Sequence, residues 1–301
     1  MSDSSIETKI SNLISWGESN GCQIDPRIKF IYNNDGSGVS AILNVPDVEQ
    51  ESDDQDIIID ISNGVILTPE AAYESLKEVI PVSVLDSFDG FQVLQIYLTY
   101  LRYNNNYMNS KWFNYIDLLP IEINSPLIWS LNDLNLYLSN TNLINGCHLK
   151  LIEIYKKFLN FKNLLNLSEQ QDEHHDDDDD IEYIHNFYHS NSDSANWFNF
   201  KSYLWSYLII TSRSFPYKLI HNLDNNNSNN SKFNKLNSVI LLPIIDLLNH
   251  KPKSKVYWNG NINNEKNFKF TKLIKDYKIE VDSNDNNDLQ IYNNYGPKVK
   301  N

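Results

Sequence analysis

Polar side chains that could build a binding site gather near the C-terminus of this sequence. Asp246 and the pair Asn249-His250 follow an apolar run and a proline, and Tyr295-Gly296 places a phenol where the chain must turn. Polar groups at the end of a buried segment give a pocket a few fixed hydrogen-bonding partners in apolar surroundings. The alternative is that Asn249 and His250 only satisfy buried backbone groups. The spacing therefore indicates either a small-molecule site or a local structural cap.

Two further segments carry residue types that suit contact with a ligand. Asp35-Gly36-Ser37-Gly38 lies between two predicted strands, and its glycines allow positive φ and close approach of the backbone to a ligand. A hairpin turn explains the same residues. A dinucleotide-binding fingerprint is excluded because no third glycine opens a following helix. Arg213 follows a predicted helix, where arginine commonly caps carbonyls, but its position ahead of the Asn-His pair gives it weight as a site residue.

The predicted secondary structure that positions these residues changes along the chain from strands to helices and back to strands. An amphipathic helix is predicted for residues 5 to 20, and short β-branched runs follow it. From about residue 68 to 211 the periodicity is helical, and strand patterns return after residue 237. The predicted later helices are 85–103, 148–161 and 196–211, and the predicted strands are 28–32, 39–43, 57–61, 239–242, 255–258, 268–270, 277–281 and 289–292. We therefore predict an α+β fold of small sheets interrupted by a long helical insert.

Two low-complexity segments interrupt this plan and are predicted to be mobile loops. One is the acidic tract 173–180, and the other is the Asn-rich stretch 224–234. The first begins with Glu173-His174-His175, and His185 and His189 follow at i, i+4 spacing. Such histidines could bind a metal in a hydrolase. Because the tract has the composition of a solvated loop, the metal reading is the weaker one.

The charge of the sequence is concentrated in one place. The net charge is −14, yet residues 172–182 alone carry eight acidic side chains and no Lys or Arg. The rest of the chain is only mildly acidic, so it lacks the basic footprint of a nucleic-acid-binding protein. Acidic faces can instead attract basic protein substrates.

Cys22 and Cys147 have no metal-ligand spacing, so neither a disulfide framework nor a zinc site is expected. Neither a signal peptide nor a membrane-spanning run is present, so a cytoplasmic or nuclear location is expected.

Taken together and in this order, these segments resemble the SET domain. The similar branch includes the Rubisco large-subunit methyltransferase and fungal methyltransferases of ribosomal proteins and elongation factor. The matching segments are Pro-x-x-Asp-x-x-Asn-His at 243–250, Tyr-Gly-Pro-Lys-x-x-Asn at 295–301, and the insert landmarks Leu118-Leu119-Pro120, Ser125-Pro126-Leu127-Ile128-Trp129 and Asn140-Thr141-Asn142-Leu143. The likeness covers essentially the whole chain. It implies a SET-type β fold, divided as 1–67, a helical insert 68–212, and 213–301.

The resemblance also implies an activity, S-adenosylmethionine-dependent methylation of a protein lysine without a metal. Methyl transfer to an amine is an in-line displacement, so positioning and desolvation dominate. The implied cofactor-binding residues are Asp35, Gly36, Ser37, Arg213, Asn249 and His250. The implied catalytic residue is Tyr295, and the implied substrate-binding residues are Arg213, Asp246 and Tyr257, with Trp258 as the alternative to Tyr257.

The resemblance further implies a protein partner. The overall pattern and the Asn-rich composition look most like fungal enzymes that modify a ribosomal protein, with an elongation factor or cytochrome c as alternatives. We expect a monomer with no direct contact to nucleic acid or membrane. Relatives continue past the Tyr-Gly segment into a second Tyr-Gly-Phe segment and a helical domain, so the sequence is expected to be C-terminally truncated. The rival interpretation is a catalytically inactive SET-like protein-binding module or an inactive fragment.

Overall fold

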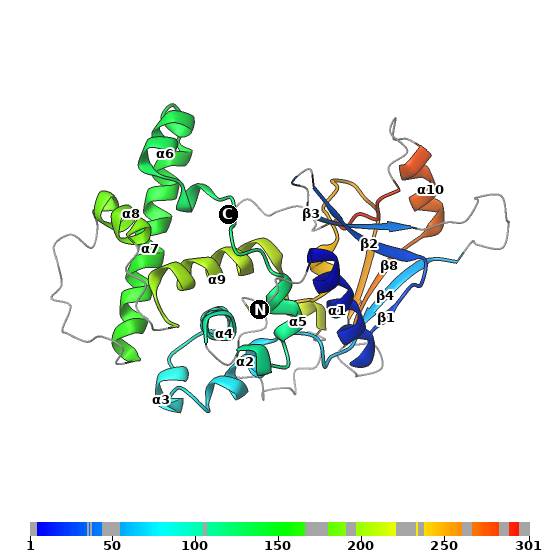
Figure 1. Cartoon of the computed structure of the whole chain (residues 1–301), viewed down its shortest axis with the longest axis horizontal. Coiled ribbons are helices and arrows are strands. Elements are labelled where there is room, and N and C mark those ends of the chain that lie inside the picture. The colour runs from blue at the N-terminus through cyan, green and yellow to red at the C-terminus, as the bar shows by residue number, and fades with distance from the viewer. Residues whose placement is uncertain are drawn as a thin grey trace. The chain divides into compact units, whose positions relative to one another are not determined.

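The described residues of the computed structural model form two compact units (Figure 1). The structure describes residues 5–34, 36, 38–43, 55–104, 107–165, 180–190, 197–220, 233, 238–260, 267–282 and 289–294. One unit, here called the sheet unit, is built from residues 1–69 and 213–301, and the other, the helical unit, from residues 70–212. Of the two predicted loops, all but Asp180 and Phe233 lie outside the described residues.

The sheet unit holds small antiparallel sheets. A four-stranded sheet has the order β1 (Gln23–Ile24), β4 (Ile57–Ile61), β8 (Phe268–Lys272) and β7 (Tyr257–Gly260). Two two-stranded sheets pair β2 (Ile28–Asn33) with β3 (Gly38–Leu43) and β5 (Ser214–Pro216) with β6 (Val239–Leu241). In β4 and β8 every second residue is buried, which is the period that puts alternate side chains on one face. The apolar alternation in the sequence therefore places these strands.

The helix α1 (Ile6–Ser19) begins the sheet unit, as predicted. Ser5 caps it, because the Ser5 hydroxyl accepts a hydrogen bond from the backbone N–H of Thr8 at 3.3 Å. Its buried face includes Leu13 and Gly17. A Cβ on Gly17 would lie 2.5 Å from the Cδ1 of Ile244, so the glycine allows Ile244 to approach the helix. Figure 1 shows α1 beside the sheet strands of its own unit.

Two predicted strands of the C-terminal region differ from the structure. Residues 277–281 belong to the helix α10 (Ile274–Asp282). Tyr277 and Ile279 alternate in the sequence like strand residues, but the buried pair is Ile274 and Tyr277 at helical spacing, and Ile279 is exposed. Residues 289–292 form no separate named strand, but they pair with β3 through an antiparallel bridge of Gln290 to Ile42, in which the Leu43 N–H donates to the Leu289 carbonyl at 3.2 Å and the Ile291 N–H donates to the Ala41 carbonyl at 2.7 Å.

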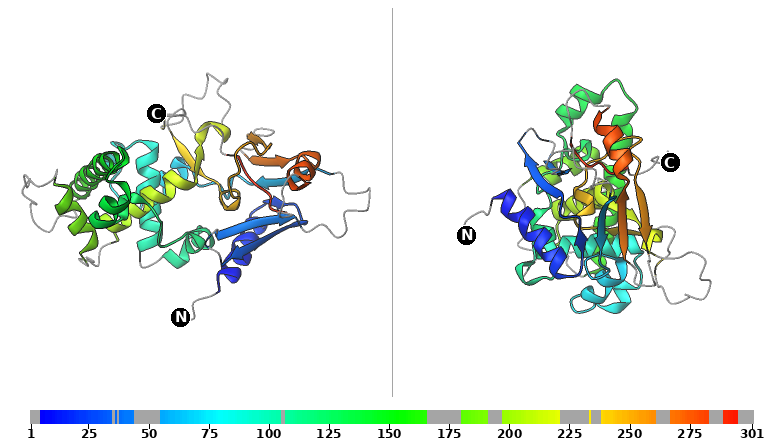
Figure 2. Two further views of the ribbon diagram at one scale, coloured as in Figure 1. Left: turned by 90° about the horizontal axis from the view of Figure 1, so that it is seen from above. Right: turned by 90° about the vertical axis from the view of Figure 1, so that its right-hand side faces the viewer.

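The helical unit contains the remaining helices of the described chain. They are α2 (Pro69–Leu76), α3 (Val82–Leu85), α4 (Gly90–Tyr103), α5 (Phe113–Leu118), α6 (Leu131–Leu138), α7 (Leu143–Leu164), α8 (Ile181–His189) and α9 (Phe200–Arg213). The helix predicted from residue 85 begins at Gly90 because Asp89 and Gln92 form a capping box there. Figure 2 shows α7 and α8 packed together within this unit. No described helix is long and apolar enough to cross a membrane.

Aromatic side chains form much of the core of the helical unit. The rings of Phe158 and Phe198 stack with centroids 5.4 Å apart, and the Tyr203 ring lies 5.7 Å from that of Phe198. Tyr203 is fully buried, and burial raises its pKa far above the usual value for a phenol. The core therefore joins α7 to α9 through ring contacts.

Candidate functional site

Arg213 and Asp246 are brought together in the sheet unit. Arg213 is the last residue of α9, and Asp246 lies in the short 3₁₀ turn Ile245–Leu247. The Arg213 Nη1 lies 3.2 Å from the Asp246 Oδ2 and also donates to the Asp246 backbone carbonyl at 3.2 Å. The Asp246 side chain is 1% exposed, so the guanidinium supplies the charge that a buried carboxylate requires.

The backbone immediately before Asp246 is strained. Ile244 has φ 77° and ψ −49°, a region that β-branched residues rarely adopt. The Ile244 side chain is fully buried, so packing holds the residue in this conformation. Such strain persists only where the surrounding structure fixes it, and it is common at functional sites.

Asn249 joins the Asn-His segment to the hairpin that carries the glycine turn. Its Nδ2 donates to the backbone carbonyl of Val39 and to the hydroxyl of Ser40, both at 3.3 Å. The Ser40 hydroxyl also lies 2.9 Å from the Gln290 Nε2 and 2.6 Å from the Asn33 Nδ2. Ser40 is therefore a buried hub for three side-chain amides, which the sequence analysis missed. The signal that could have found it is a small polar residue inside the apolar strand β3.

The segment that leads into Tyr295 runs beside the Asn-His pair. His250 and Asn293 form a parallel bridge, in which the Asn293 N–H donates to the Asn249 carbonyl at 2.8 Å and the Lys251 N–H donates to the Asn293 carbonyl at 3.0 Å. The Asn293 side chain is fully buried. Its Oδ1 accepts from the Trp258 indole at 3.1 Å, and its Nδ2 has no hydrogen-bond partner in the described part of the chain. Asn293 is a second polar residue that the sequence analysis missed.

The buried Lys272 is connected through Ser254 to the same segment before Tyr295. Lys272 takes an inward position of β8 and is fully buried. Its ammonium contacts the Glu280 carboxylate at 2.5 Å and the Ser254 hydroxyl at 2.9 Å. Burial lowers the pKa of Lys272, while Glu280 acts in the opposite direction. The Ser254 carbonyl in turn accepts from the Asn294 side chain at 3.0 Å, so the network extends to the residue before Tyr295.

The structure describes some of the predicted site residues and not others. Gly36, Arg213, Asp246, Asn249, His250 and Tyr257 are described, whereas Asp35, Ser37 and Tyr295 lie outside the described residues. Gly36 has φ 88°, as the predicted turn requires, and nothing lies within 4 Å of a Cβ built there. The described contacts join Arg213 to Asp246, and Asn249 to the strand after Gly36.

Tyr257 and Trp258 point to opposite faces of β7. Tyr257 is 54% exposed, and among the described residues no hydrogen bond or ion pair joins it to the other site residues. The Trp258 ring packs on Phe215 at 5.5 Å and on Phe268 at 6.3 Å, and its N–H is held by Asn293. Trp258 is thus half-buried against the core, and Tyr257 is the more exposed of the two.

The residues present fit a nucleoside cofactor such as S-adenosylmethionine. The fit is a backbone turn at positive φ with open space beside it, next to a strand edge that the Asn249 amide holds in place. The Asn293 Nδ2 is a buried donor without a partner among the described residues, as expected where a ligand supplies the acceptor. The metal alternative has no such support. His174 and His175 lie outside the described residues, and no group of three or more potential ligands in the described ranges could hold an ion.

The fold is that of the SET domain with a helical insert. Two solved structures show this likeness: Rubisco LSMT bound to AdoMet, with TM-score 0.60, 14% identity and coverage of 96% of this chain and 53% of that chain, and the SET domain of LSMT bound to lysine and AdoHcy, with TM-score 0.60, 13% identity and coverage of 98% and 55%. At this identity the likeness concerns the fold. The α+β prediction with a helical insert is therefore confirmed.

Sequence relatives give the closer comparison, although no family model matches the chain. The chain is 27% identical to Saccharomyces cerevisiae protein-lysine N-methyltransferase EFM1 over 277 residues, 86% of this chain and 44% of the relative. It is 29% identical to ribosomal lysine N-methyltransferase 1 of the same yeast, covering 82% and 41%, and 28% identical to Schizosaccharomyces pombe ribosomal lysine N-methyltransferase set10, covering 93% and 42%. The chain thus spans less than half the length of these relatives. The resemblance to this branch of SET-domain proteins is confirmed.

Proposed function

We propose that the chain is the SET region of an S-adenosylmethionine-dependent protein-lysine N-methyltransferase that acts on a ribosomal protein or another translation component. One observation carries the proposal. The Asn249 side chain binds the strand after the glycine turn, while the Asn249 carbonyl binds the segment before Tyr295. Two segments that lie far apart in the sequence, the strand after the glycine turn and the residues before Tyr295, therefore both contact Asn249. The named activities of the three sequence relatives support the same conclusion.

The proposed roles follow from these contacts. The backbone at Gly36 and the side chains of Asn249 and His250 would hold the cofactor, which supplies a methyl group on a sulfonium when it is bound. Asp246 holds the Arg213 guanidinium in place at 3.2 Å, and in our proposal this guanidinium contacts the cofactor or the substrate. Little covalent help from the protein is needed, because methyl transfer is a displacement that depends on alignment.

The amine must be neutral before it can attack. An unperturbed lysine has a pKa of about 10.4, so a narrow apolar channel that disfavours the ammonium helps to expose the lone pair. In our proposal the Tyr295 hydroxyl orients this amine, and Tyr257 borders the entrance to the channel. What supports this role is that side-chain hydrogen bonds hold residues 293 and 294, which come immediately before Tyr295.

We also propose the organisation and setting of the protein. Residues 1–67 and 213–301 would form one SET domain around the insert 68–212, because the two compact units divide after residues 69 and 212. A monomer in the cytoplasm or nucleus agrees with two free cysteines and with the translation-related names of the relatives. Light scattering and imaging of a tagged protein would test these statements.

Calorimetric titration with S-adenosylmethionine tests the cofactor site. The chain is expected to bind it, and Asn249→Ala is expected to weaken binding at least tenfold, since it frees the Asn-His segment from β3. The matched control is Asn259→Ala on the exposed side of β7, which should bind like the parent. Equal affinity of both variants, or no binding by the folded parent, would contradict the proposal.

Transfer of labelled methyl groups to purified ribosomal proteins tests the activity. The protein encoded by the whole reading frame should label a ribosomal protein, and Tyr295→Phe should reduce turnover strongly while leaving cofactor affinity unchanged. Cofactor binding without transfer to any translation component would instead favour the inactive SET-like binding module.

A further inference from the structure

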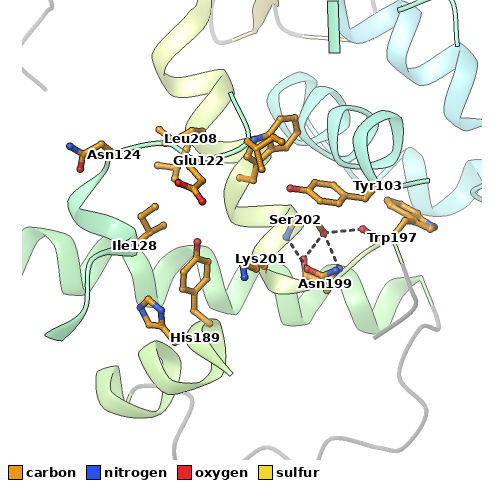
Figure 3. Close-up of a pocket in the computed structure, with 14 residues that line it drawn as sticks. Tyr103, Glu122, Asn124, Ile128, His189, Trp197, Asn199, Lys201, Ser202 and Leu208 are labelled. Atoms are coloured by element: carbon orange, nitrogen blue, oxygen red, sulfur yellow. Dashed lines mark hydrogen bonds between the residues drawn. The ribbon is translucent and has the colours of Figure 1, made fainter. Parts of the chain in front are cut away.

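A pocket of about 960 Å³ lies within the helical unit, apart from every predicted site residue (Figure 3). Its walls come from α8, α9, the end of α4 and the segment 121–128, all of which belong to the helical unit. This volume is at the upper end of the usual range for small-molecule sites and can hold more than one side chain of a peptide.

Aromatic rings form fixed walls of this pocket. The Tyr103 and Trp205 rings meet edge to face at 5.6 Å, and the Trp205 N–H donates to the Pro120 carbonyl at 2.8 Å. Trp197, at another side of the pocket, meets the Tyr100 ring edge to face at 5.2 Å. Aromatic faces attract cations through their negative quadrupole, and Trp is the strongest of them. The Arg102 guanidinium already lies 5.9 Å from the centroid of the Trp205 ring, so the Trp197 and Tyr103 side of the pocket is the part that we consider for a further cation.

The polar groups of the pocket differ in how far they are already engaged. Asn199 and Ser202 cap α9 through mutual hydrogen bonds, from the Ser202 N–H to the Asn199 Oδ1 at 2.9 Å and from the Asn199 N–H to the Ser202 Oγ at 3.1 Å. Glu122 differs, because no hydrogen bond or ion pair of the described residues occupies its carboxylate. Figure 3 shows the Glu122 carboxylate and the Tyr103 hydroxyl directed into the hollow.

The opposite side of the pocket carries a positive charge. The Lys201 Nζ lies 6.0 Å from the centroid of the Tyr188 ring. Tyr188 is also near Glu122, since burial and the negative charge of Glu122 together raise the pKa of the Tyr188 hydroxyl. The negative charge of Glu122 favours a cationic ligand and the positive charge of Lys201 disfavours it. Substitution of each residue therefore tests the sign of the ligand's charge.

The charge of the surrounding unit favours a basic ligand. Residues 70–212 contain 19 Asp and Glu and 8 Lys and Arg, and eight of these acidic residues lie in the tract 172–182, so the rest of the unit keeps a small acidic excess of 11 to 8. Such a field draws basic protein segments toward the unit. The exposed Ile121, at 68%, adds an apolar contact beside Glu122 for residues that flank the basic side chain.

We propose that this pocket binds an arginine or lysine side chain within a basic segment of the protein substrate, with Glu122 as the counter-charge and the aromatic walls as the cation-binding surface. The side chain bound here is not the one that receives the methyl group, because the proposed reaction site is built in the sheet unit. The role in substrate binding rests on the proposed function, whereas the binding of a basic peptide does not.

Tryptophan fluorescence titration of the 301-residue chain tests the proposal with short acetylated, amidated peptides. The peptides Gly-Ala-Arg-Ala-Gly and Gly-Ala-Lys-Ala-Gly should bind, and the Glu-containing equivalent should not. Glu122→Gln should weaken binding of the basic peptides about twofold to fivefold, the size expected for an exposed ion pair. Lys201→Met should strengthen it, because it removes the opposing charge. Glu182→Gln on the exposed side of α8 changes the net charge equally and should leave the affinity unchanged.

The signs of these effects decide between the alternatives. Weaker binding in Lys201→Met together with tighter binding in Glu122→Gln would mean that the pocket takes an anion and would overturn the proposal. Equal affinity of Glu122→Gln and Glu182→Gln would overturn it as well. Thermal unfolding of each variant separates these results from loss of folding. Titration with S-adenosylmethionine separates the two proposals, since Glu122→Gln should bind the cofactor like the parent, and a chain without cofactor binding could still bind the peptide.

Discussion

The indole N–H of Trp258 donates a hydrogen bond of 3.1 Å to the side-chain carbonyl of Asn293. This bond ties the strand β7 to the segment that enters Tyr295. Trp258 itself is held by ring contacts with Phe215 and Phe268, so the support for Asn293 comes from the core of the sheet unit. A residue two positions before the proposed catalytic tyrosine is therefore positioned by an aromatic side chain that does not touch the substrate in our proposal.

Trp258→Phe tests this positioning role. Phe keeps an aromatic ring against Phe215 but loses the N–H, so the free energy of unfolding should fall by about 1 to 2 kcal/mol. Methyl transfer should fall more than cofactor affinity, because the change affects the segment before Tyr295. The control is Trp129→Phe, which removes an indole hydrogen bond to Asn124 in the helical unit and should leave turnover unchanged. A loss of turnover in both variants would argue against a specific role.

Arg213→Met tests the ion pair with Asp246. It leaves a carboxylate that is 1% exposed without its cation, so unfolding should become easier by about 3 kcal/mol, and cofactor affinity should fall at least tenfold. The double variant Arg213→Met, Asp246→Asn should recover part of the stability but not the affinity. Arg27→Met breaks another Arg-Asp pair in the same unit, with Asp25, and should change stability alone. Chemical denaturation and calorimetry measure the two quantities.

Substitutions of Lys272 and Glu280 test how much a buried ion pair contributes to the stability of the protein. Glu280→Gln leaves the fully buried ammonium of Lys272 without its carboxylate and should cost about 2 to 4 kcal/mol of stability. Lys272→Met combined with Glu280→Gln should be closer to the parent, because no charge then remains buried. Glu153→Gln, which affects exposed pairs with Lys150 and Lys157, should change stability by less than about 1 kcal/mol. Urea unfolding of all three would show whether this order holds.

His185 predicts a loss of stability in mild acid. Burial lowers its pKa to about 4, with smaller effects of His148 and His189. In the unfolded chain its pKa is about 6.5, so the unfolded state binds the proton first, and stability falls as the pH drops from about 6.5 to 4. The loss is at most about 3 kcal/mol and levels off below pH 4. His185→Phe should remove this part of the pH dependence, whereas His189→Gln on the exposed side should retain it. Parallel unfolding curves of parent and His185→Phe at every pH would contradict the assignment.

Two glycines give opposite expectations for the same substitution. A Cβ on Gly260 would lie 1.5 Å from the Leu219 carbonyl oxygen, so Gly260→Ala must move the backbone and should destabilise the protein by several kcal/mol. Gly146 lies in α7 with nothing within 4 Å of its Cβ position. Gly146→Ala should therefore stabilise the helix by about 0.5 to 1 kcal/mol. Thermal unfolding of both variants measures the contrast.

Regular periodicity explains which elements could be predicted from the sequence. The alternation Ile57, Ile59, Ile61 gives the strand β4 with its observed bounds. The same rule fails at Tyr277 and Ile279, because a nine-residue helix with few buried positions leaves too short a pattern to tell from alternation. Helix starts at Gly90 and Phe200 were missed by several residues, since the caps at Asp89 and Asn199 determine them.

The candidate site could be predicted only in part. The resemblance supplies the residues that would touch the cofactor, but not Ser40, Asn293 or Lys272, which support them. Ser40 and Lys272 lie in strands at positions that read as core, whereas Asn293 lies next to Asn294 in a polar stretch, and Ser40 and Asn293 have partners far away in the sequence. Lys272 shows the signal most clearly, because it follows Phe268 and Phe270 at an inward position of β8. A polar residue in an inward register is thus a sign of a buried network.

The strained conformation of Ile244 has a consequence for the first helix of the chain. Ile244 is held at φ 77° while its side chain lies against α1, where Gly17 leaves room for it. Two residues later, Asp246 meets Arg213. The helix α1 therefore supports the backbone that leads to the Arg213–Asp246 pair, although it contributes no residue to the proposed site. A proposed site built from the C-terminal part of the sequence thus depends on packing against a helix at the N-terminal end.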